Sequence, residues 1–348
     1  MRAVLLAAGH GSRLRPLTDE IPKCLVPVNG RPLIDYWLRN LAAIGVERFL
    51  VNLHHRSDMV RAYLEQGPFA RQIEFVCEKE LLGTGGTLLA NRGFLVSGTT
   101  LVAHADNLCL CDFSAFVAAH RDRPRGTELT LMTFRAAEPR GCGIVELDAQ
   151  GVVRGFHEKA ADPPGNLASA AVFMVEPELV GALDAIGRPV IDLSRDVLPR
   201  MTGRMFAWHN SSYHRDIGDA ESWLAAQTDF PGDGRNPGGG RHWLEVCRPD
   251  GGAAFRIVQS VAAMWRADRV VGLQAPAFAA ARDPGGEAWD PVRTLVVADD
   301  YREADMAWLG VRAERSSTLV LFWRVPGSFL AARLYCDFGI KSIGFCAA

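Results

Sequence analysis

Short apolar runs alternate with amphipathic stretches along the first hundred residues of the chain. Ala3–Ala8 is a continuous apolar run, typical of a buried strand. Pro32–Ile44 carries apolar residues at three- and four-residue spacing, which predicts a helix closed by Gly45 as its C-terminal cap. The same alternation predicts strands at Arg48–Leu53, Ile73–Cys77 and Thr100–Ala105, and helices at Ser57–Gln66, with Ser57 as N-cap, and at Thr87–Arg92.

This order of elements predicts βαβ units. We therefore expect an α/β fold with a Rossmann-like, mostly parallel sheet and helices on both of its faces. Such sheets bind ligands outside the carboxyl ends of their strands. Three segments fall at that edge, namely Gly9–Arg15, the loop after Cys77 and His104–Asn107. We expect these segments to converge on one crevice.

The middle of the chain carries longer extended runs. Strands are predicted at Glu128–Arg135, Gly143–Leu147, Val152–His157, Leu167–Val175 and Met205–Asn210, with a turn at Asp148–Gly151. Helices are predicted at Pro177–Ile186 and at Asp219–Gln227, the second with Asp219 as its N-cap.

The composition then changes at Pro231–Arg241, which holds five glycines and two prolines in eleven residues and reads as a linker. We predict a first domain over 1–230, the linker over 231–241, and a smaller C-terminal α+β domain over 242–348. Within that domain we expect a helix at Ala253–Trp265, strands at Thr294–Ala298 and Thr318–Trp323, and either element at Phe329–Leu334.

The loop after the first strand has the composition of an anion-binding loop. Its glycines let the backbone approach an anion, and Arg13, Arg15 and Lys23 offer positive charge to phosphate oxygens. A dinucleotide-binding fingerprint does not fit, because Leu14 stands at the third glycine position, and the Walker A motif is absent. A purely structural turn is the alternative on spacing alone.

Composition narrows the functional classes. The chain has 348 residues, of which 48% are hydrophobic and 22% charged, as in globular proteins with a substantial core. A formal net charge of −2 gives no basic footprint for nucleic acid. The sequence shows no signal peptide and no apolar run of ~18 residues, and its eight cysteines are scattered, so we expect a cytoplasmic protein with reduced thiols. Cys109 and Cys111 are interpreted as packing residues.

Two acidic residues stand where a hard cation could bind. Asp106 follows the strand Thr100–Ala105 at the carboxyl edge of the sheet, and Asp216, in the run Tyr213–Gly218, is the natural second ligand. Mg²⁺ is bound by one or two carboxylates together with substrate phosphates. A turn or capping role is the competing interpretation for each carboxylate.

Two further groups offer contacts to a substrate. Glu158 and Lys159 follow a strand and would point to opposite sides, so the carboxylate can accept sugar hydroxyls while the ammonium meets a phosphate. A solvated surface pair is the alternative. In Gly83–Thr87 the glycines let the backbone approach a planar base, and a simple helix-entry turn is the alternative.

In this order the motifs resemble those of the sugar-phosphate nucleotidyltransferases, the enzymes that make nucleoside-diphosphate sugars. The matching stretches are LAAGHGSRLRPLT (Leu6–Thr18), PKCLVPVNGRPLI (Pro22–Ile34), LLGTGG (Leu81–Gly86), HADN (His104–Asn107), GIVELDAQGVVRGFHEK (Gly143–Lys159) and RDIGDAESW (Arg215–Trp223). The resemblance implies the nucleotide-diphospho-sugar transferase fold for residues 1–227. It also implies transfer of a nucleoside monophosphate from a nucleoside triphosphate to a sugar 1-phosphate, with release of pyrophosphate.

The resemblance implies a role for each matched position. Catalysis is assigned to Arg13, Lys23 and Asp106, and Mg²⁺ binding to Asp106 and Asp216. Nucleotide binding is assigned to Ala8, Gly9, Gly11, Ser12, Gly83, Thr84 and Gly85, and sugar-phosphate binding to Gly143, Glu158, Lys159 and Ser169. Guanylyltransferases acting on mannose or heptose 1-phosphate are the most similar subfamily, so GTP is favoured over UTP, dTTP and CTP. Neither nucleic acid nor a membrane is expected as a partner, and a homo-oligomer is compatible with the sequence.

Three departures from the family pattern fall near the expected site. Ala105 replaces the usual glycine before the metal aspartate, and Cys142 replaces a tyrosine. Ser169, Ala171 and Phe173 stand where the family commonly has the Asn, Gly and Tyr of an N-x-G-x-Y strand. These changes raise a second hypothesis, a catalytically impaired regulatory protein that binds nucleotide sugars. The intact arginine, lysine and aspartates of the motifs argue against it.

Overall fold

The computed structural model describes residues 1–15, 17–28 and 31–231, together with four strands near the C-terminus. The chain divides into two compact units, which are described separately. The sheet unit comprises Met1–His10 and Tyr36–Asp216, and the second unit comprises Gly11–Asp35 and Ile217–Ala348.

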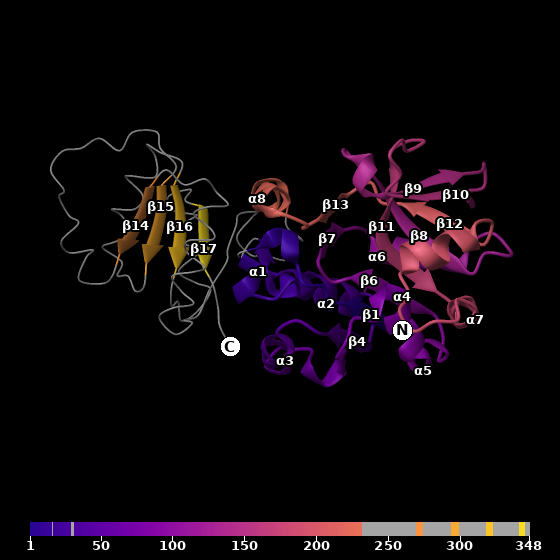
Figure 1. Cartoon of the computed structure of the whole chain (residues 1–348), viewed down its shortest axis with the longest axis horizontal. Helices are drawn as coiled ribbons and strands as arrows, with labels where there is room; N and C mark the ends of the chain where they lie inside the picture. Colours follow the sequence, from indigo (N-terminus) through magenta and orange to yellow (C-terminus); the bar gives the residue numbers. More distant parts are fainter. Residues whose placement is uncertain are drawn as a thin grey trace. The chain divides into compact units, whose positions relative to one another are not determined.

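One half of the large sheet is parallel, as the βαβ pattern predicts (Figure 1). Its strands stand in the order β6-β1-β4-β5, and all neighbouring pairs are parallel. Their bounds are β1 (Arg2–Leu6), β4 (Arg48–Leu53), β5 (Ile73–Cys77) and β6 (Thr100–His104). β1 ends at Leu6, two residues earlier than predicted, so Ala7 and Ala8 already belong to the loop.

The other half of the sheet branches from β11 (Leu167–Val175), which is antiparallel to β6. β8 (Leu129–Arg135) and β9 (Gly143–Leu147) both pair with β11, and they carry β12 (Met205–His209) and β10 (Val153–Glu158) on their outer edges. The register of β11 on β8 shifts between Ser169 and Phe173. The sheet is therefore mixed, with nine strands in all, and the predicted α/β fold class is confirmed.

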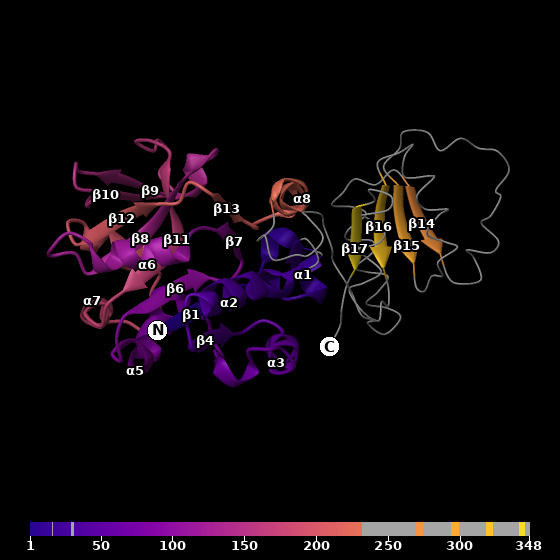
Figure 2. The same ribbon diagram turned by 180° about the vertical axis from the view of Figure 1, so that it is seen from behind.

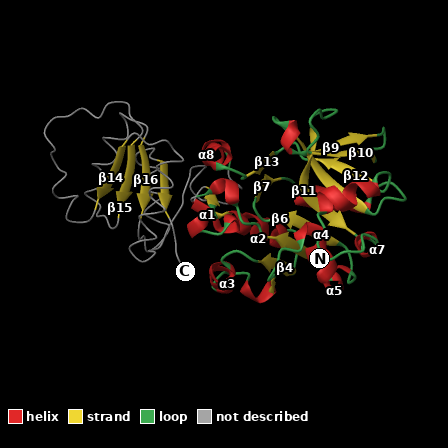
Figure 3. Cartoon of the chain, viewed as in Figure 1, coloured by secondary structure: helices red, strands yellow, loops and turns green. Residues whose placement is uncertain are grey.

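Both faces of β1 are buried, which explains its continuous apolar sequence. Val4 and Leu6 lie in one core cluster with residues of α4, α5 and α7. Ala3 and Leu5 are also fully buried and, because side chains alternate along a strand, they face the opposite side. The helices are α2 (Leu33–Ala43), α3 (Ser57–Glu65), α4 (Gly83–Ala90), α5 (Arg92–Leu95), α6 (Phe113–Arg121) and α7 (Leu179–Asp184), shown in red in Figure 3.

Two predicted helix starts are wrong. Ser57 is the first helical residue of α3 instead of its N-cap, because Arg56 takes the cap position with a left-handed backbone (φ 49°) and no side-chain cap bond forms. α4 starts at Gly83, four residues before the predicted start at Thr87, so the glycine cluster forms the first turn of the helix. Gly45, with φ 86°, follows α2 as expected.

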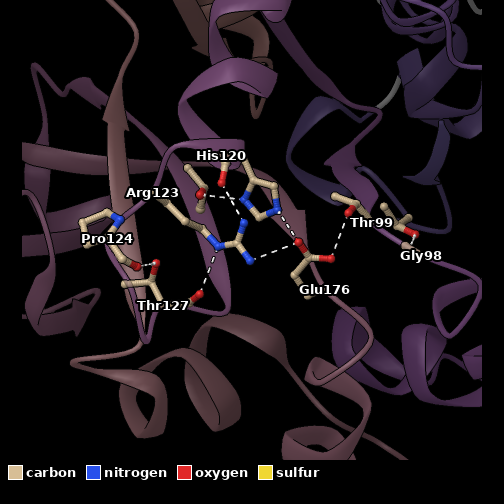
Figure 4. A network of polar contacts seen from close by, with 9 residues as sticks. Gly98, Thr99, His120, Arg123, Pro124, Thr127 and Glu176 are labelled. Carbon is tan, nitrogen blue, oxygen red and sulfur yellow. Dashed lines mark hydrogen bonds and ion pairs between the residues drawn. The ribbon is translucent and has the colours of Figure 1, made fainter.

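A network of polar side chains ties the amino end of β6 to α6 (Figure 4). Glu176 accepts hydrogen bonds from Thr99 Oγ1 at 2.8 Å and from Arg123 Nη2 at 3.0 Å, and its Oε1 lies 3.1 Å from His120 Nε2. His120 is buried and its Nδ1 lies 2.8 Å from Thr130 Oγ1. Glu176 follows Val175, which pairs with the first residue of β6, so this network lies at the end of the strand away from His104.

The second unit holds the segment that follows the first loop and the helix that follows Asp216. It contains α1 (Leu17–Glu20), the short pair β2 (Pro27–Val28) and β3 (Arg31–Pro32), and α8 (Ala220–Asp229). The indole Nε1 of Trp223, on α8, donates to the carbonyl of Pro27 at 2.9 Å, which fixes α8 on β2. Asp219 caps α8 as predicted, in a reciprocal capping box with Ser222.

Near the C-terminus four parallel strands lie side by side, as Figure 2 also shows from behind. They are β14 (Arg269–Leu273), β15 (Thr294–Ala298), β16 (Thr318–Phe322) and β17 (Lys341–Gly344). The predicted strands at 294–298 and 318–323 are thus confirmed. The predicted helix at 253–265, the segment 329–334 and the linker beyond Pro231 lie outside the described residues.

Within the described ranges, no helix is long and apolar enough to cross a membrane. The five cysteines placed there, Cys24, Cys77, Cys109, Cys111 and Cys142, form no disulfide. Cys109 is buried, in line with its predicted packing role, and its Sγ lies 3.7 Å from Sδ of Met132.

Candidate functional site

The segments that carry Asp106 and Asp216 are joined by a two-stranded ribbon. β7 (Asn107–Leu110) and β13 (Tyr213–Asp216) pair in antiparallel fashion, and Asp216 lies opposite Asn107, the residue after Asp106. Asn107 is buried, its Nδ2 donates to the carbonyl of Ala170 at 3.2 Å, and its own carbonyl accepts from Trp37 Nε1 at 2.8 Å. These bonds hold the start of the ribbon against β11 and α2. The sequence did not reveal β7, because the HADN segment was interpreted only as a strand end.

Glu158 and Lys159, which were assigned to sugar-phosphate binding, affect the pKa of the same thiol as Asp216 does. Burial raises the pKa of the Cys142 thiol, and the negative charges of Asp216 and Glu158 raise it further, while Lys159 opposes them. The thiol is therefore within electrostatic range of all three charges. Lys159 N also donates to the carbonyl of Cys142 at 3.0 Å. The charges of three predicted site residues thus act on one side chain, at a position where the sequence departs from the family pattern.

A glycine on the neighbouring strand leaves the space that the carboxylate of Glu158 occupies. Gly143 of β9 pairs with Glu158 of β10, and a Cβ at Gly143 would lie 2.8 Å from Glu158 Oε2 and 2.7 Å from Cζ of Phe156. Only glycine leaves room for this carboxylate without movement of its neighbours. The Nζ of Lys159 lies 3.9 Å from Glu158 Oε1, and Lys159 itself has a left-handed backbone with φ 49°.

Arg195 and Asp192 are charged neighbours of Glu158 that sequence reasoning missed. Burial raises the pKa of Glu158; among the charges around it, Asp192 also raises the pKa, whereas Lys159 and Arg195 lower it. Asp192 accepts a hydrogen bond from Arg195 N at 3.0 Å and begins a short helical turn at Leu193–Val197. The two residues lie far from Glu158 in sequence, and the run IDLSR carries no motif that would have singled them out.

Ser169 lies where β11 changes its pairing. Its Oγ accepts a hydrogen bond from Ala171 N at 3.3 Å, and Ala171 has φ 53°, a left-handed conformation that favours glycine. The glycine expected from the family pattern at this position is thus replaced by alanine while the backbone keeps the conformation that glycine adopts easily.

The glycine cluster forms a helix entry packed against another segment of the sheet unit. Gly83 has φ 73°, and a Cβ there would lie 2.5 Å from the carbonyl oxygen of Ile191. Gly85 N donates to that oxygen at 2.8 Å, and Thr84 Oγ1 accepts from Leu193 N at 2.8 Å. The helix-entry alternative therefore describes the local structure. The nucleotide-binding roles assigned to Gly83, Thr84 and Gly85 stay predictions.

The phosphate-loop residues of the second unit form a compact turn. Gly11 has φ 62°, and its carbonyl accepts from Thr18 Oγ1 at 2.8 Å. Ser12 and Arg13 follow in a short 3₁₀ turn, Ser12–Leu14. A Cβ at Gly11 would lie 2.8 Å from Cγ2 of Thr18, so the turn requires glycine at this position.

Arg13 and Lys23 share Asp219 as a charge partner, which the sequence identified only as a helix cap. Burial would raise the pKa of Asp219, but hydrogen bonds from Ser222 and the charges of Arg13 and Lys23 lower it overall. Lys23 is buried, with 7% of its surface exposed. The two predicted catalytic cations thus lie close to one carboxylate. Ala8 and Gly9 belong to the sheet unit, and the convergence of all these residues on one crevice stays a prediction.

Comparison with known sequences decides the family. The sequence profile described as nucleotidyl transferase matches residues 2–231, which is well over half of the chain. The chain belongs to the nucleotidyl transferase family.

Solved structures share the fold of this family member: HddC from Yersinia pseudotuberculosis complexed with GMP-PN is 23% identical, with a TM-score of 0.55 over 66% of this chain and 99% of that one. A UDP-glucose pyrophosphorylase complexed with UDP-glucose is 20% identical, with a TM-score of 0.56 over 65% of this chain and 96% of that one.

Among curated sequences, the family member is 31% identical over 233 residues to the mannose-1-phosphate guanylyltransferase of Mycobacterium tuberculosis. The match covers 66% of this chain and 64% of that protein. The putative mannose-1-phosphate guanyltransferase of Sulfolobus acidocaldarius is 30% identical over 57% of this chain and 54% of its own length. The chain therefore spans less than two thirds of the length of these relatives.

Proposed function

We propose that this chain transfers a nucleoside monophosphate from a nucleoside triphosphate to a sugar 1-phosphate, with GTP and mannose or heptose 1-phosphate as the favoured substrates. The register of β13 on β7 supports the proposal, because it sets Asp216 opposite Asn107, the residue after Asp106, while the charges of Asp216 and Glu158 both act on the thiol of Cys142. The names of the relatives from M. tuberculosis and S. acidocaldarius support GTP and mannose 1-phosphate.

In the proposed reaction, an oxygen of the sugar 1-phosphate attacks the α-phosphorus of the triphosphate. The bond from the α-phosphorus to the oxygen that bridges the α- and β-phosphates breaks, and pyrophosphate leaves with that electron pair. The attacking oxygen is already ionised at neutral pH, so no general base is required. The protein's contribution is to align the two phosphates and to neutralise their charge.

Arg13 and Lys23 are the side chains proposed to hold the triphosphate. The charges of both side chains lower the pKa of Asp219, so this carboxylate offsets part of their positive charge. The guanidinium can form two parallel hydrogen bonds to phosphate oxygens, whereas the ammonium acts as a compact point charge.

Asp106 and Asp216 are the residues proposed to hold Mg²⁺. Their donor set fits this ion, because two carboxylates leave positions for phosphate oxygens and water. Throughout the described segments there is no group of three or more His, Cys, Asp or Glu side chains arranged to hold a metal, so a closed protein site is not formed there. A bound Mg²⁺ would offset the negative charge of the triphosphate.

Glu158 and Lys159 are proposed to bind the sugar 1-phosphate. The half-buried carboxylate of Glu158 lies in the space left by Gly143 and can accept sugar hydroxyls. The side chain of Lys159 is more exposed, at 55%, and its ammonium can reach a phosphate.

The proposal is tested by pyrophosphate release. The full chain is incubated with MgCl₂, each of the four common nucleoside triphosphates and a panel of sugar 1-phosphates. GTP with mannose or heptose 1-phosphate should release pyrophosphate fastest, and mass spectrometry should detect the matching nucleoside-diphosphate sugar. If a nucleotide sugar binds but no pair releases pyrophosphate, the proposed transfer is wrong and the regulatory hypothesis is favoured.

A further inference from the structure

Glu78 places a buried carboxylate between three parts of the sheet unit. It follows β5 directly, and only 8% of its surface is exposed. Its Oε1 accepts from Asn52 Nδ2 at 2.8 Å and from the hydroxyl of Thr87, and its Oε2 accepts from Leu82 N at 3.1 Å. A buried carboxylate is retained at low cost only when donors satisfy it, and here the donors are an amide, a hydroxyl and a backbone N–H.

One branch of this network reaches the end of β1. Asn52, the next-to-last residue of β4, is 3% exposed, and its Oδ1 accepts from Ala7 N at 2.7 Å. Because Asn52 donates to Glu78 with one end of its amide and accepts from Ala7 with the other, Glu78 fixes which way this amide points. Ala7 is the first residue after β1 and leads directly into Ala8 and Gly9.

The other branch reaches the start of α4. Leu82 N, just before the helix, donates to Glu78, and Thr87, one turn further on, is 1% exposed and also contacts the carbonyl of Gly83 through its hydroxyl. A carboxylate at the first turn of a helix is also favoured by the helix dipole. Glu78 therefore sets the position of the turn that carries Gly83 and Thr84.

We propose that Glu78 is a positioning residue for the nucleotide, which acts through Asn52 on the Ala8–Gly9 segment and through Leu82 on the Gly83–Gly85 turn. The inference rests on the proposed nucleotidyl transfer. Both segments were assigned to nucleotide binding, and one buried carboxylate holds the backbone of each. Glu78 itself faces Asn52, Leu82 and Thr87, so it acts on substrate through these residues.

The network can be tested by exchanging the carboxylate of Glu78 and the amide of Asn52, singly and together. In Glu78→Gln, the new amide must turn an NH₂ group toward Asn52 Nδ2 or toward Leu82 N, and two donors then face each other. In Asn52→Asp, two carboxylates meet in a buried site. The double variant Asn52→Asp/Glu78→Gln restores complementary partners. The carboxylate introduced at position 52 accepts from Ala7 N and from the amide introduced at position 78, and the oxygen of that amide still accepts from Leu82 N.

We expect Glu78→Gln to raise KM for GTP by roughly 10- to 100-fold, because a backbone displaced by about 1 Å costs that much. KM for the sugar 1-phosphate should change less than about 2-fold, which corresponds to about 0.4 kcal/mol. The double variant should bring KM for GTP back to within about 5-fold of the natural protein, which corresponds to a remaining free-energy difference of about 1 kcal/mol. Should Glu78→Gln not fold, Asn52→Ala, which leaves Glu78 bonded to Leu82 and Thr87, is expected to raise KM for GTP in the same way.

A readout that needs no turnover is hydrogen exchange at the amide of Ala7, followed by mass spectrometry of a peptide covering residues 4–9, in which Ala7 lies beyond the two N-terminal residues that lose their label. Exchange should speed up in Glu78→Gln and slow down again in the double variant. If the natural protein releases no pyrophosphate, the proposed function fails, and the exchange pattern still decides whether Glu78 holds the loop.

Glu176→Gln is the matched control, because Glu176 is also a carboxylate held by several donors, at the other end of β6 (Figure 4). It should lower the melting temperature as Glu78→Gln does, while KM for GTP and exchange at Ala7 stay unchanged. The proposal is overturned if Glu78→Gln leaves both unchanged, if the double variant restores neither, or if Glu176→Gln raises KM for GTP equally.

Discussion

The guanidinium of Arg13 rests against the backbone of Gly218, so that a Cβ built on Gly218 would lie 2.9 Å from Arg13 Nη2. Gly218 precedes Asp219, whose pKa is lowered in part by the charge of Arg13. The position of the proposed catalytic arginine thus depends on a residue that lacks a side chain, two positions after Asp216.

Gly218→Ala should therefore lower kcat. The added methyl group is closer to the guanidinium than real contacts allow, and the flexible end of Arg13 moves more easily than the backbone does. We expect kcat to fall roughly 10- to 100-fold because the cation is displaced from the reacting phosphates. Steady-state kinetics measure the effect, with Gly93→Ala as control, since a Cβ at Gly93 meets nothing within 4 Å. Equal kcat values for both variants would contradict the assignment of Arg13.

Asp106→Ala should abolish turnover while the fold is kept. Loss of one of two carboxylates weakens the proposed Mg²⁺ site, and several kcal/mol of charge stabilisation correspond to a loss of at least about 100-fold in rate. Pyrophosphate release is followed over a range of MgCl₂ concentrations, and circular dichroism checks the fold. Asp112→Asn, at the N-cap of α6, is the control and should keep the rate. Undiminished turnover of Asp106→Ala would remove Asp106 from the metal site.

Ala171→Gly should stabilise the sheet unit. Ala171 has φ 53°, a conformation that costs a residue with a Cβ about 1 kcal/mol. Glycine avoids this cost, and the extra conformational entropy that it loses on folding is smaller than the strain it relieves. We expect the free energy of unfolding to rise by about 0.5 kcal/mol in urea titrations. Ala170→Gly, at the buried neighbour outside that region, should instead lower it by about 1 kcal/mol. If both substitutions destabilise equally, the left-handed backbone at Ala171 is not the source of strain.

The strands of the parallel half were predictable because their sequences are governed by local burial. Arg48–Leu53 and Ile73–Cys77 form strands at the predicted bounds, and Gly143–Leu147 does so in the antiparallel half. Where two local signals compete, prediction failed at the boundary: Ser57 is a favoured cap, but a left-handed Arg56 takes that position. The glycines at 83–86 were expected to precede a helix, yet packing against Ile191 holds them in its first turn.

The charged residues of the site were predictable where they belong to contiguous motifs, as Glu158 and Lys159 do. The partners of these residues were not, because their effect depends on tertiary packing. Arg195 is 37 positions from Glu158 in the printed sequence and becomes its electrostatic neighbour only in the folded sheet. Glu78 had no recognisable metal or catalytic spacing, and its network with Asn52 and Thr87 requires β4, β5 and α4 to be assembled.

Acidification should destabilise the protein through the Glu176 network. Burial lowers the pKa of His120 below 6.5, and the charge of Arg123 adds to this effect, so below pH 6.5 the unfolded chain binds a proton that the native ring resists.

For Glu176, burial would raise the pKa, but the hydrogen bond from Thr99, with His120 and Arg123, lowers it below 4.5. The stability contributed by Glu176 is therefore present above pH 4.5 and is lost as the pH falls through its native pKa. Urea titrations between pH 8 and pH 3 should show the free energy of unfolding falling below pH 6.5, and Glu176→Gln should flatten the part of this fall below pH 4.5. The exposed Glu47→Gln is the control, and an equal flattening by that variant would show that the network is not responsible.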